Sequence, residues 1–141
     1  MQIQKRLSFF LASIFSGTLL ISGLAQAEQL NSEQVTALVS GKTVYAVHEK
    51  RDFDITSYFS SDGTVISFRN EEKYKGKWHT KSDGSHCIQF NDPYSGELKK
   101  ERCMFIEKDG DTYKRIKVKG NGKRIHVISY KRFAHGNAEN L

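Results

Sequence analysis

The stretch Tyr58–Ile106 decides the fold, through the segments YFSSDGTVISF (58–68), KWHTKSDGSHCIQF (77–90) and ERCMFI (101–106). It contains two Asp-Gly pairs, the only tryptophan and both cysteines of the chain. Asp-Gly is favoured in tight hairpin turns, where the backbone needs positive φ. The β-branched and aromatic residues between these pairs are typical of strands. The stretch therefore predicts successive β-hairpins closed by one disulfide.

The same pattern continues on both sides of this stretch. Further turns are predicted at Asp109-Gly110 and Gly120-Asn121-Gly122, and the only proline, Pro93, falls in a loop. We expect about eight strands, at residues 43–48, 54–59, 64–68, 73–80, 86–90, 102–107, 112–118 and 124–130. Such an antiparallel meander avoids exposed edges by curling, so the predicted fold is mainly β, a small barrel or a strongly bent sheet. The polar tail from residue 133 is expected to lie over the surface.

One short helix is predicted before the strands, near residues 31–39. Asn31 or Ser32 can cap it, because a side-chain oxygen there accepts hydrogen bonds from free amides of the first turn. Gly41 follows at a natural stop. A helix this short is not stable alone, so we expect it to pack on the sheet or to plug one end of it.

Residues 1–27 have the pattern of a secretory signal peptide. Lys5 and Arg6 precede an apolar run over residues 7–24, and Ala25-Gln26-Ala27 is a small-x-small cleavage site. An uncleaved membrane anchor is the alternative. Cleavage would leave residues 28–141 as a single β-rich domain without a transmembrane segment, in the bacterial periplasm or secreted from the cell.

The charge of this domain is modest. Loss of Lys5 and Arg6 leaves 20 Lys and Arg against 16 Asp and Glu, a net charge of +4. The basic residues are spread along the strands, so we do not expect nucleic acid as a partner. The 114 residues are enough for one small domain with one core. We expect a monomer.

Cys87 and Cys103 are expected to form a disulfide, the default for two cysteines in an exported chain. The bond would close a loop of 15 residues, which stabilises a fold by roughly 3 kcal/mol. The alternatives are a redox pair, which normally has the spacing Cys-x-x-Cys, or two metal thiolates.

A two-residue turn centred on Asp83-Gly84 would set which side chains share a face. Alternation then places Trp78 and Cys87 on one face, and His79 and His86 on the other. If Cys103 lies opposite Cys87, Phe105 joins the Trp78 face. This predicts a core cluster of Trp78, the disulfide and Phe105. The alternative is that Trp78 and Phe105 line a ligand cavity inside a barrel.

His79 and His86 are the metal candidates, since they would lie diagonally on one face. Zinc or copper needs three or four ligands, and the spacing does not show that His48, His126 or His135 supplies the rest. We therefore expect exposed histidines, no metal and no cofactor. Residues 113–117 beside 124–132 are interpreted as a basic solvated face, with a binding face of aromatic and basic side chains as the alternative.

Catalytic patterns are weak. No Ser lies in a G-x-S-x-G turn, and no Gly-rich phosphate loop precedes a helix. The carboxylates fall in loops or at strand ends, and the cysteines are assigned to a disulfide. We expect no catalytic residues and no enzymatic activity, with a small hydrolase as the alternative.

The order of short motifs resembles the DUF995-like proteins, small exported proteobacterial proteins of unknown function. The motifs span nearly the whole of the predicted domain: Gly41–Val44, Tyr58–Val65, Gly76–Trp78, Asp83–Cys87, Cys103, Asp109–Tyr113 and Gly136–Leu141. The resemblance implies export and a small β domain. It implies no catalytic residue.

The sequence leaves several function hypotheses open. The main one is a non-enzymatic periplasmic or secreted β-barrel that binds an unknown small ligand or an envelope protein. A protein inhibitor, such as a periplasmic lysozyme inhibitor, is the second, by analogy of fold. A metal-binding envelope protein is the third.

Overall fold

The computed structural model describes residues 26–141, so the signal peptide expected over residues 1–27 lies almost wholly outside the described part. The elements follow in the order β1 (Glu28–Gln29), α1 (Ser32–Val39), β2 (Lys42–His48), β3 (Phe53–Phe59), β4 (Thr64–Arg69), β5 (Glu72–Thr80), β6 (His86–Phe90), β7 (Arg102–Asp109), β8 (Thr112–Val118) and β9 (Arg124–His135). All eight predicted strands are present. The tail is shorter than expected, because β9 includes Phe133 and ends at His135.

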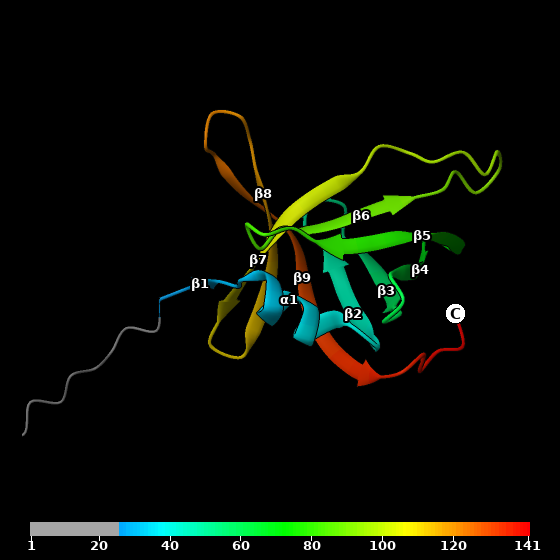
Figure 1. The fold of residues 1–141 in the computed structure, drawn as a ribbon, viewed down its shortest axis with the longest axis horizontal. Helices are drawn as coiled ribbons and strands as arrows, with labels where there is room; N and C mark the ends of the chain where they lie inside the picture. Colours follow the sequence, from blue (N-terminus) through cyan, green and yellow to red (C-terminus); the bar gives the residue numbers. More distant parts are fainter. Residues whose placement is uncertain (1–25) are drawn as a thin grey trace, which may run out of the picture.

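Strands β2 to β9 form a closed antiparallel barrel (Figure 1). Each strand pairs with the next in sequence, and β9 closes the ring by pairing with β2. The short β1 pairs with β7 at Glu107 and Lys108, beyond the point where β6 stops pairing with it. The predicted eight-stranded meander is confirmed as a barrel with one additional strand.

Helix α1 closes one end of this barrel. Asn31 caps it through a reciprocal pair of hydrogen bonds: its side chain accepts from the Gln34 N–H at 2.9 Å, and the Gln34 side chain accepts from the Asn31 N–H at 2.9 Å. Val35 and Val39 are fully buried beneath the helix. The turn at Gly84 lies so close that a Cβ there would be 2.6 Å from the Leu30 carbonyl oxygen, which explains the glycine.

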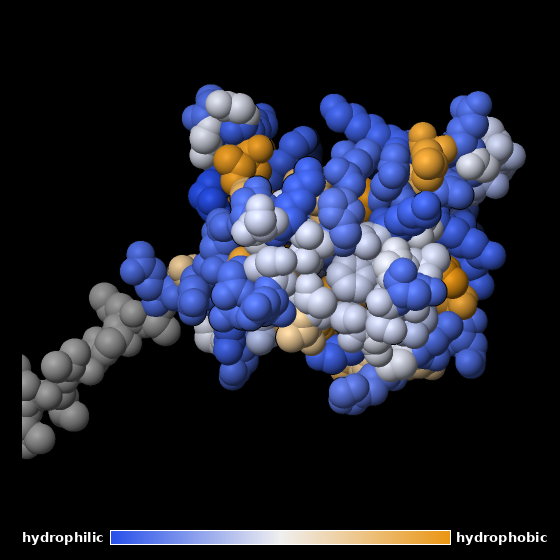
Figure 2. All heavy atoms as spheres, viewed as in Figure 1, coloured by the Kyte–Doolittle hydropathy of each residue, from blue (hydrophilic) through white to orange (hydrophobic). Residues whose placement is uncertain are grey.

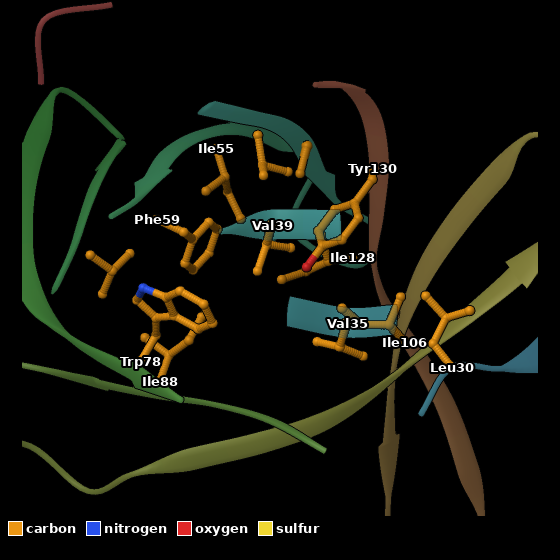
Figure 3. Close-up of a cluster of buried hydrophobic side chains, with 13 residues drawn as sticks. Leu30, Val35, Val39, Ile55, Phe59, Trp78, Ile88, Ile106, Ile128 and Tyr130 are labelled. Carbon is orange, nitrogen blue, oxygen red and sulfur yellow. The ribbon is translucent and has the colours of Figure 1, made fainter. Parts of the chain in front are cut away.

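The hydrophobic core is mostly aliphatic, and its side chains converge between the strands in Figure 3, with Phe59 and Trp78 at the helix end. Phe59 and Trp78 meet edge to face with ring centroids 5.8 Å apart. The Trp78 indole N–H donates to the Ser60 carbonyl oxygen at 2.8 Å, so this buried side chain is satisfied. We call this part of the barrel, formed by α1 and the side chains packed beneath it, the closed end.

Two segments project from the barrel at the opposite end, the open end. They are the β6–β7 loop (residues 91–101) and the β8–β9 hairpin. Figure 2 shows a mostly hydrophilic face with scattered hydrophobic spots, and Leu98 and Val118 on these segments are exposed. Among the described residues, no helix has the length and apolarity needed to span a membrane.

The predicted register of the β5–β6 hairpin was wrong by one residue. The Lys81 N–H donates to the Ser85 carbonyl at 2.9 Å, and Gly84 has φ +85°, so the loop has three residues rather than two. His79 therefore pairs with Cys87, and Trp78 with Ile88. A one-residue shift moves every side chain of one strand to the other face. Trp78 and Cys87 consequently lie on opposite faces of the sheet.

Candidate functional site

The open end of the barrel contains a cavity of about 240 Å³, which we call the mouth cavity. Its lining comes from strands and loops that are distant in sequence but adjacent around the barrel. The lining residues are His48, Arg51, Phe53, Ile55, Arg69, Ile88, Phe90, Lys99, Lys100, Arg102, Met104, Arg115, Val127 and Ile128. Their chemistry is of two kinds, apolar and cationic.

The apolar wall follows from strand alternation. Ile55 on β3, Ile88 and Phe90 on β6, and Ile128 on β9 each lie on the inner face. These residues belong to the same hydrophobic cluster as the closed end, or pack against it. The closed end fills its interior with the side chains of α1, whereas no helix of the described chain covers the mouth cavity. The wall therefore offers apolar surface to a bound molecule.

Besides Arg115 of β8, the cationic part of the lining comes from four places on the chain. Arg51 is in the β2–β3 turn, Arg69 ends β4, Lys99 and Lys100 are in the β6–β7 loop, and Arg102 begins β7. Among the described residues that line the cavity, none is acidic. The combined charge gives the mouth cavity a positive potential that attracts anions.

The β6–β7 loop is held in place by its own hydrogen bonds. The Asp92 carboxylate accepts from the N–H groups of Tyr94 and Ser95, and the Lys99 ammonium lies 3.0 Å from it. These donors lower the pKa of Asp92 to about 2. The Tyr94 hydroxyl donates to Glu72 at 2.7 Å, which ties the loop to β5. The loop therefore keeps its two lysines at the cavity.

A smaller chamber of about 50 Å³ continues from the mouth cavity into the barrel, and we call it the inner chamber. Arg115 of β8 lines both spaces. Its neighbours in the inner chamber include Tyr130 and the hydroxyl pair Ser57 and Ser67, whose oxygens are 2.5 Å apart. Burial lowers the pKa of Arg115 and raises that of Tyr130. An arginine keeps its positive charge under these conditions.

The structure assigns clear places to the sequence-predicted residues. Cys87 and Cys103 form the expected disulfide, with an S–S distance of 2.05 Å, on the outer face of the sheet. Phe105 shares that face, below the Arg124 guanidinium. Trp78 is on the inner face, on the opposite side of the sheet from the disulfide. The predicted cluster of Trp78 with the disulfide and Phe105 is therefore wrong. Neither Trp78 nor Phe105 lines the mouth cavity or the inner chamber.

The two histidines that were the metal candidates do not share a face, and the expectation that both are exposed is wrong for His86. His79 is on the outside, where its Nε2 lies 2.5 Å from the Glu101 carboxylate. His86 is fully buried beside Phe59 and Trp78, and burial holds its pKa well below the usual value. In the part of the chain that the structure describes, only His79, Cys87 and Glu101 have ligand atoms grouped closely enough for a metal. Cys87 is already bonded to Cys103, so two ligands remain.

The sequence interpretation missed Arg115. Residues 113–117 were expected to form a basic solvated face, but only 6% of Arg115 is exposed. The register of β8 shifts against β9 between Arg115 and Ile116, which allows both neighbours to be buried. The alternation Tyr113-Lys114-Arg115 was an available signal, because it places Arg115 on the same face as an aromatic residue.

Compared with models of known protein families and with curated proteins, the chain matches none.

Proposed function

We propose that this chain is an exported, monomeric and non-enzymatic β-barrel that binds a small, anionic, partly apolar molecule in the mouth cavity. One observation carries the proposal: an apolar wall and a cationic lining meet in a cavity whose described lining residues include no acid. Ligand pockets are typically concave and mostly apolar, with a few polar groups that fix orientation. The mouth cavity is concave, and its lining is divided equally between apolar residues and basic ones.

The cations at the cavity are costly for the fold in the absence of an anion. Arg51, Arg69 and Arg102 make no ion pair with any described residue. Like charges grouped in a concave site repel one another and destabilise the compact state. An anionic ligand would remove this repulsion, so its binding would be favoured by charge as well as by burial of apolar surface.

The disulfide supports the proposed location. Disulfides persist in oxidising compartments, which include the bacterial periplasm and the extracellular medium. The resemblance to exported DUF995-like proteins agrees with this location. The metal hypothesis has no comparable support among the described residues, because His79 and His86 lie on opposite faces of the sheet.

Calorimetric titration with paired ligands tests the proposal. The purified protein is titrated with octanoate and with octylammonium, which have the same chain but opposite charge. We expect octanoate to bind and octylammonium to bind at least tenfold more weakly. Absence of heat from both ligands and from several further carboxylates of similar size would overturn the proposal. Equal affinity for octanoate and octylammonium would also overturn it.

A charge-reversal pair locates the binding. Arg69→Glu alters the cavity lining, whereas Arg132→Glu alters an arginine on the outer surface, stacked over Tyr45. The first substitution should weaken octanoate binding, and the second should leave it unchanged within about twofold. Equal effects of the two would indicate attraction to the net charge of the protein rather than to the cavity.

A further inference from the structure

Arg115 is a buried cation with few partners. It lies at the junction of the mouth cavity and the inner chamber, paired along the strands with Ile106 and Ile128. One hydrogen bond is present, from Nη2 to the His86 carbonyl oxygen at 3.2 Å. Its Nε–H has no acceptor among the described residues, and Arg115 has no carboxylate partner among them. A guanidinium has five N–H donors, so most of its capacity is unused by the protein.

Tyr130 adds a second unused donor in the inner chamber. Its hydroxyl is buried and makes no hydrogen bond to any described residue. A buried Tyr hydroxyl is normally hydrogen-bonded, and unpaired buried polar groups are rare. Two donors without acceptors that line the same chamber indicate an acceptor supplied by a ligand.

The chemistry of the missing acceptor follows from the donors. A buried unpaired charge is strongly unfavourable, and an anion beside it removes most of that cost. The planar guanidinium fork matches the two oxygens of a carboxylate and holds it with parallel hydrogen bonds. The Tyr130 hydroxyl can donate to the same group. Apolar side chains, among them Ile88 and Phe90, surround these donors and favour an apolar remainder.

We propose that Arg115 and Tyr130 bind the carboxylate of the ligand head-first, with its apolar chain lying along Ile88, Phe90 and Ile128 toward the mouth. This inference rests on the proposed function and specifies its ligand class, a small monocarboxylate. The opposite orientation would place the carboxylate among the cations of the mouth cavity. Those cations already have other contacts: Lys99 pairs with Asp92, and Arg69 lies 4.3 Å from the centre of the Tyr74 ring.

The cations of the mouth cavity then have a different role from Arg115, which is to attract the ligand. Long side chains at an opening are screened by water and salt, so each contributes less to affinity than a buried cation does. Their summed potential increases the rate at which anions reach the opening. Arg115 is shielded from solvent, where a charge-assisted hydrogen bond is stronger. The cations of the mouth cavity thus attract the anionic ligand, and Arg115 in the interior recognises its carboxylate.

Volume limits the length of the ligand. One water occupies roughly 30 Å³ in the liquid, so a space of about 240 Å³ holds about eight groups of similar size. Octanoate therefore suits the cavity, and hexadecanoate exceeds it. A carboxylate with a single aromatic ring, such as phenylpropionate, is of the same size class.

Calorimetry with two head groups and matched variants tests the inference. Octanoate and octanol are titrated into the wild-type protein, Arg115→Met, Tyr130→Phe and the surface control Arg132→Met. Charged hydrogen bonds of this kind change affinity by roughly ten- to a hundredfold. We expect Arg115→Met to lose that factor for octanoate, Tyr130→Phe to lose a smaller one, and Arg132→Met to lose none. Octanol should bind the wild type and Arg115→Met equally.

The outcomes separate this inference from the proposed function. Octanoate that binds the wild type and Arg115→Met with the same affinity would overturn head-first recognition while leaving the mouth cavity as a binding site. Octanol binding as tightly as octanoate would do the same. If Arg115→Met does not fold, Tyr130→Phe and Arg115→Lys give the answer, because an unchanged octanoate affinity in both contradicts the inference. Absence of binding by any carboxylate would instead overturn the proposed function.

Discussion

At the closed end of the barrel, Val35 and Val39 are fully buried beside Phe59 and Trp78, whereas at the open end Arg51 and Arg102 line a cavity of about 240 Å³. The closed end has a capped helix and a hydrogen-bonded indole. At the open end, Arg51, Arg69 and Arg102 make no ion pair with any described residue. We interpret the closed end as the source of stability and the open end as a site where the fold is less stable because its residues serve binding.

Loss of the central aromatic side chain of the closed end should have the largest effect on stability. Trp78→Ala removes a side chain that is 7% exposed and packs against Phe59 and His86. Substitutions of this kind lower the free energy of unfolding by about 3–5 kcal/mol. Urea denaturation measures the change. Tyr94→Ala on the exposed β6–β7 loop is the control, and a similar loss in both variants would contradict the comparison.

The disulfide should contribute to stability but not to binding. Cys87 and Cys103 lie on the outer face of β6 and β7, away from the mouth cavity. Replacing both with alanine should lower the free energy of unfolding by roughly 3 kcal/mol, from the size of the loop that the bond closes. Octanoate affinity should remain within about twofold of wild type. A strong loss of octanoate affinity with little loss of stability would contradict this, because it would show that the disulfide supports the binding site rather than the stability of the fold.

Acidification should weaken the closed end through His86. Burial holds the pKa of His86 well below 6.5 in the folded protein, so the unfolded chain takes up this proton first as the pH falls. The free energy of unfolding should therefore decrease below pH 6.5, by up to about 1.4 kcal/mol per pH unit. Burial and the charge of Arg51 also lower the pKa of His48, which adds to the same trend.

Urea denaturation between pH 5 and 7 separates the histidine contribution from that of the carboxyl groups, which titrate mainly below that window. His86→Phe should reduce the slope. Trp78→Phe alters the same cluster without removing a titratable group and should keep it. An unchanged slope in His86→Phe would show that His86 is not the buried neutral group described above.

The smallest expected change has the opposite sign. Arg115→Met replaces a buried, unpaired cation with an apolar side chain of comparable length. Such replacements are often neutral or stabilising, so we expect the free energy of unfolding to rise by about 1 kcal/mol while octanoate affinity falls. Lower stability in this variant would indicate that Arg115 supports the fold rather than the ligand.

The fold was predictable from sequence because it depends on local signals. Asp-Gly turns, strand alternation and the Asn31 cap each act over a few residues, and the strands they predict are all present. Face assignments were less predictable. The loop Ser82–Gly84 has one residue more than a two-residue turn, and this alone exchanged the faces of Cys87 and His86.

The candidate site was not predictable, for a related reason. Its residues come from strands that meet only after the barrel closes, and Arg115 reaches the cavity from β8 between Ile106 of β7 and Ile128 of β9. No local pattern marks Arg51, Lys100 and Arg102 as neighbours around one opening. The family resemblance, export and the non-enzymatic character stay predictions.

An NMR titration tests the central claim most directly. Octanoate is added to the isotope-labelled protein, and the chemical shifts of backbone and methyl groups are followed to saturation. We predict progressive changes at Ile55, Ile88 and Ile128, with a shift of the Arg115 Nε–H, and little change at Val35 and Val39 in the closed end. Changes confined to the outer surface, or none at millimolar octanoate, would contradict a binding site inside the open end of the barrel.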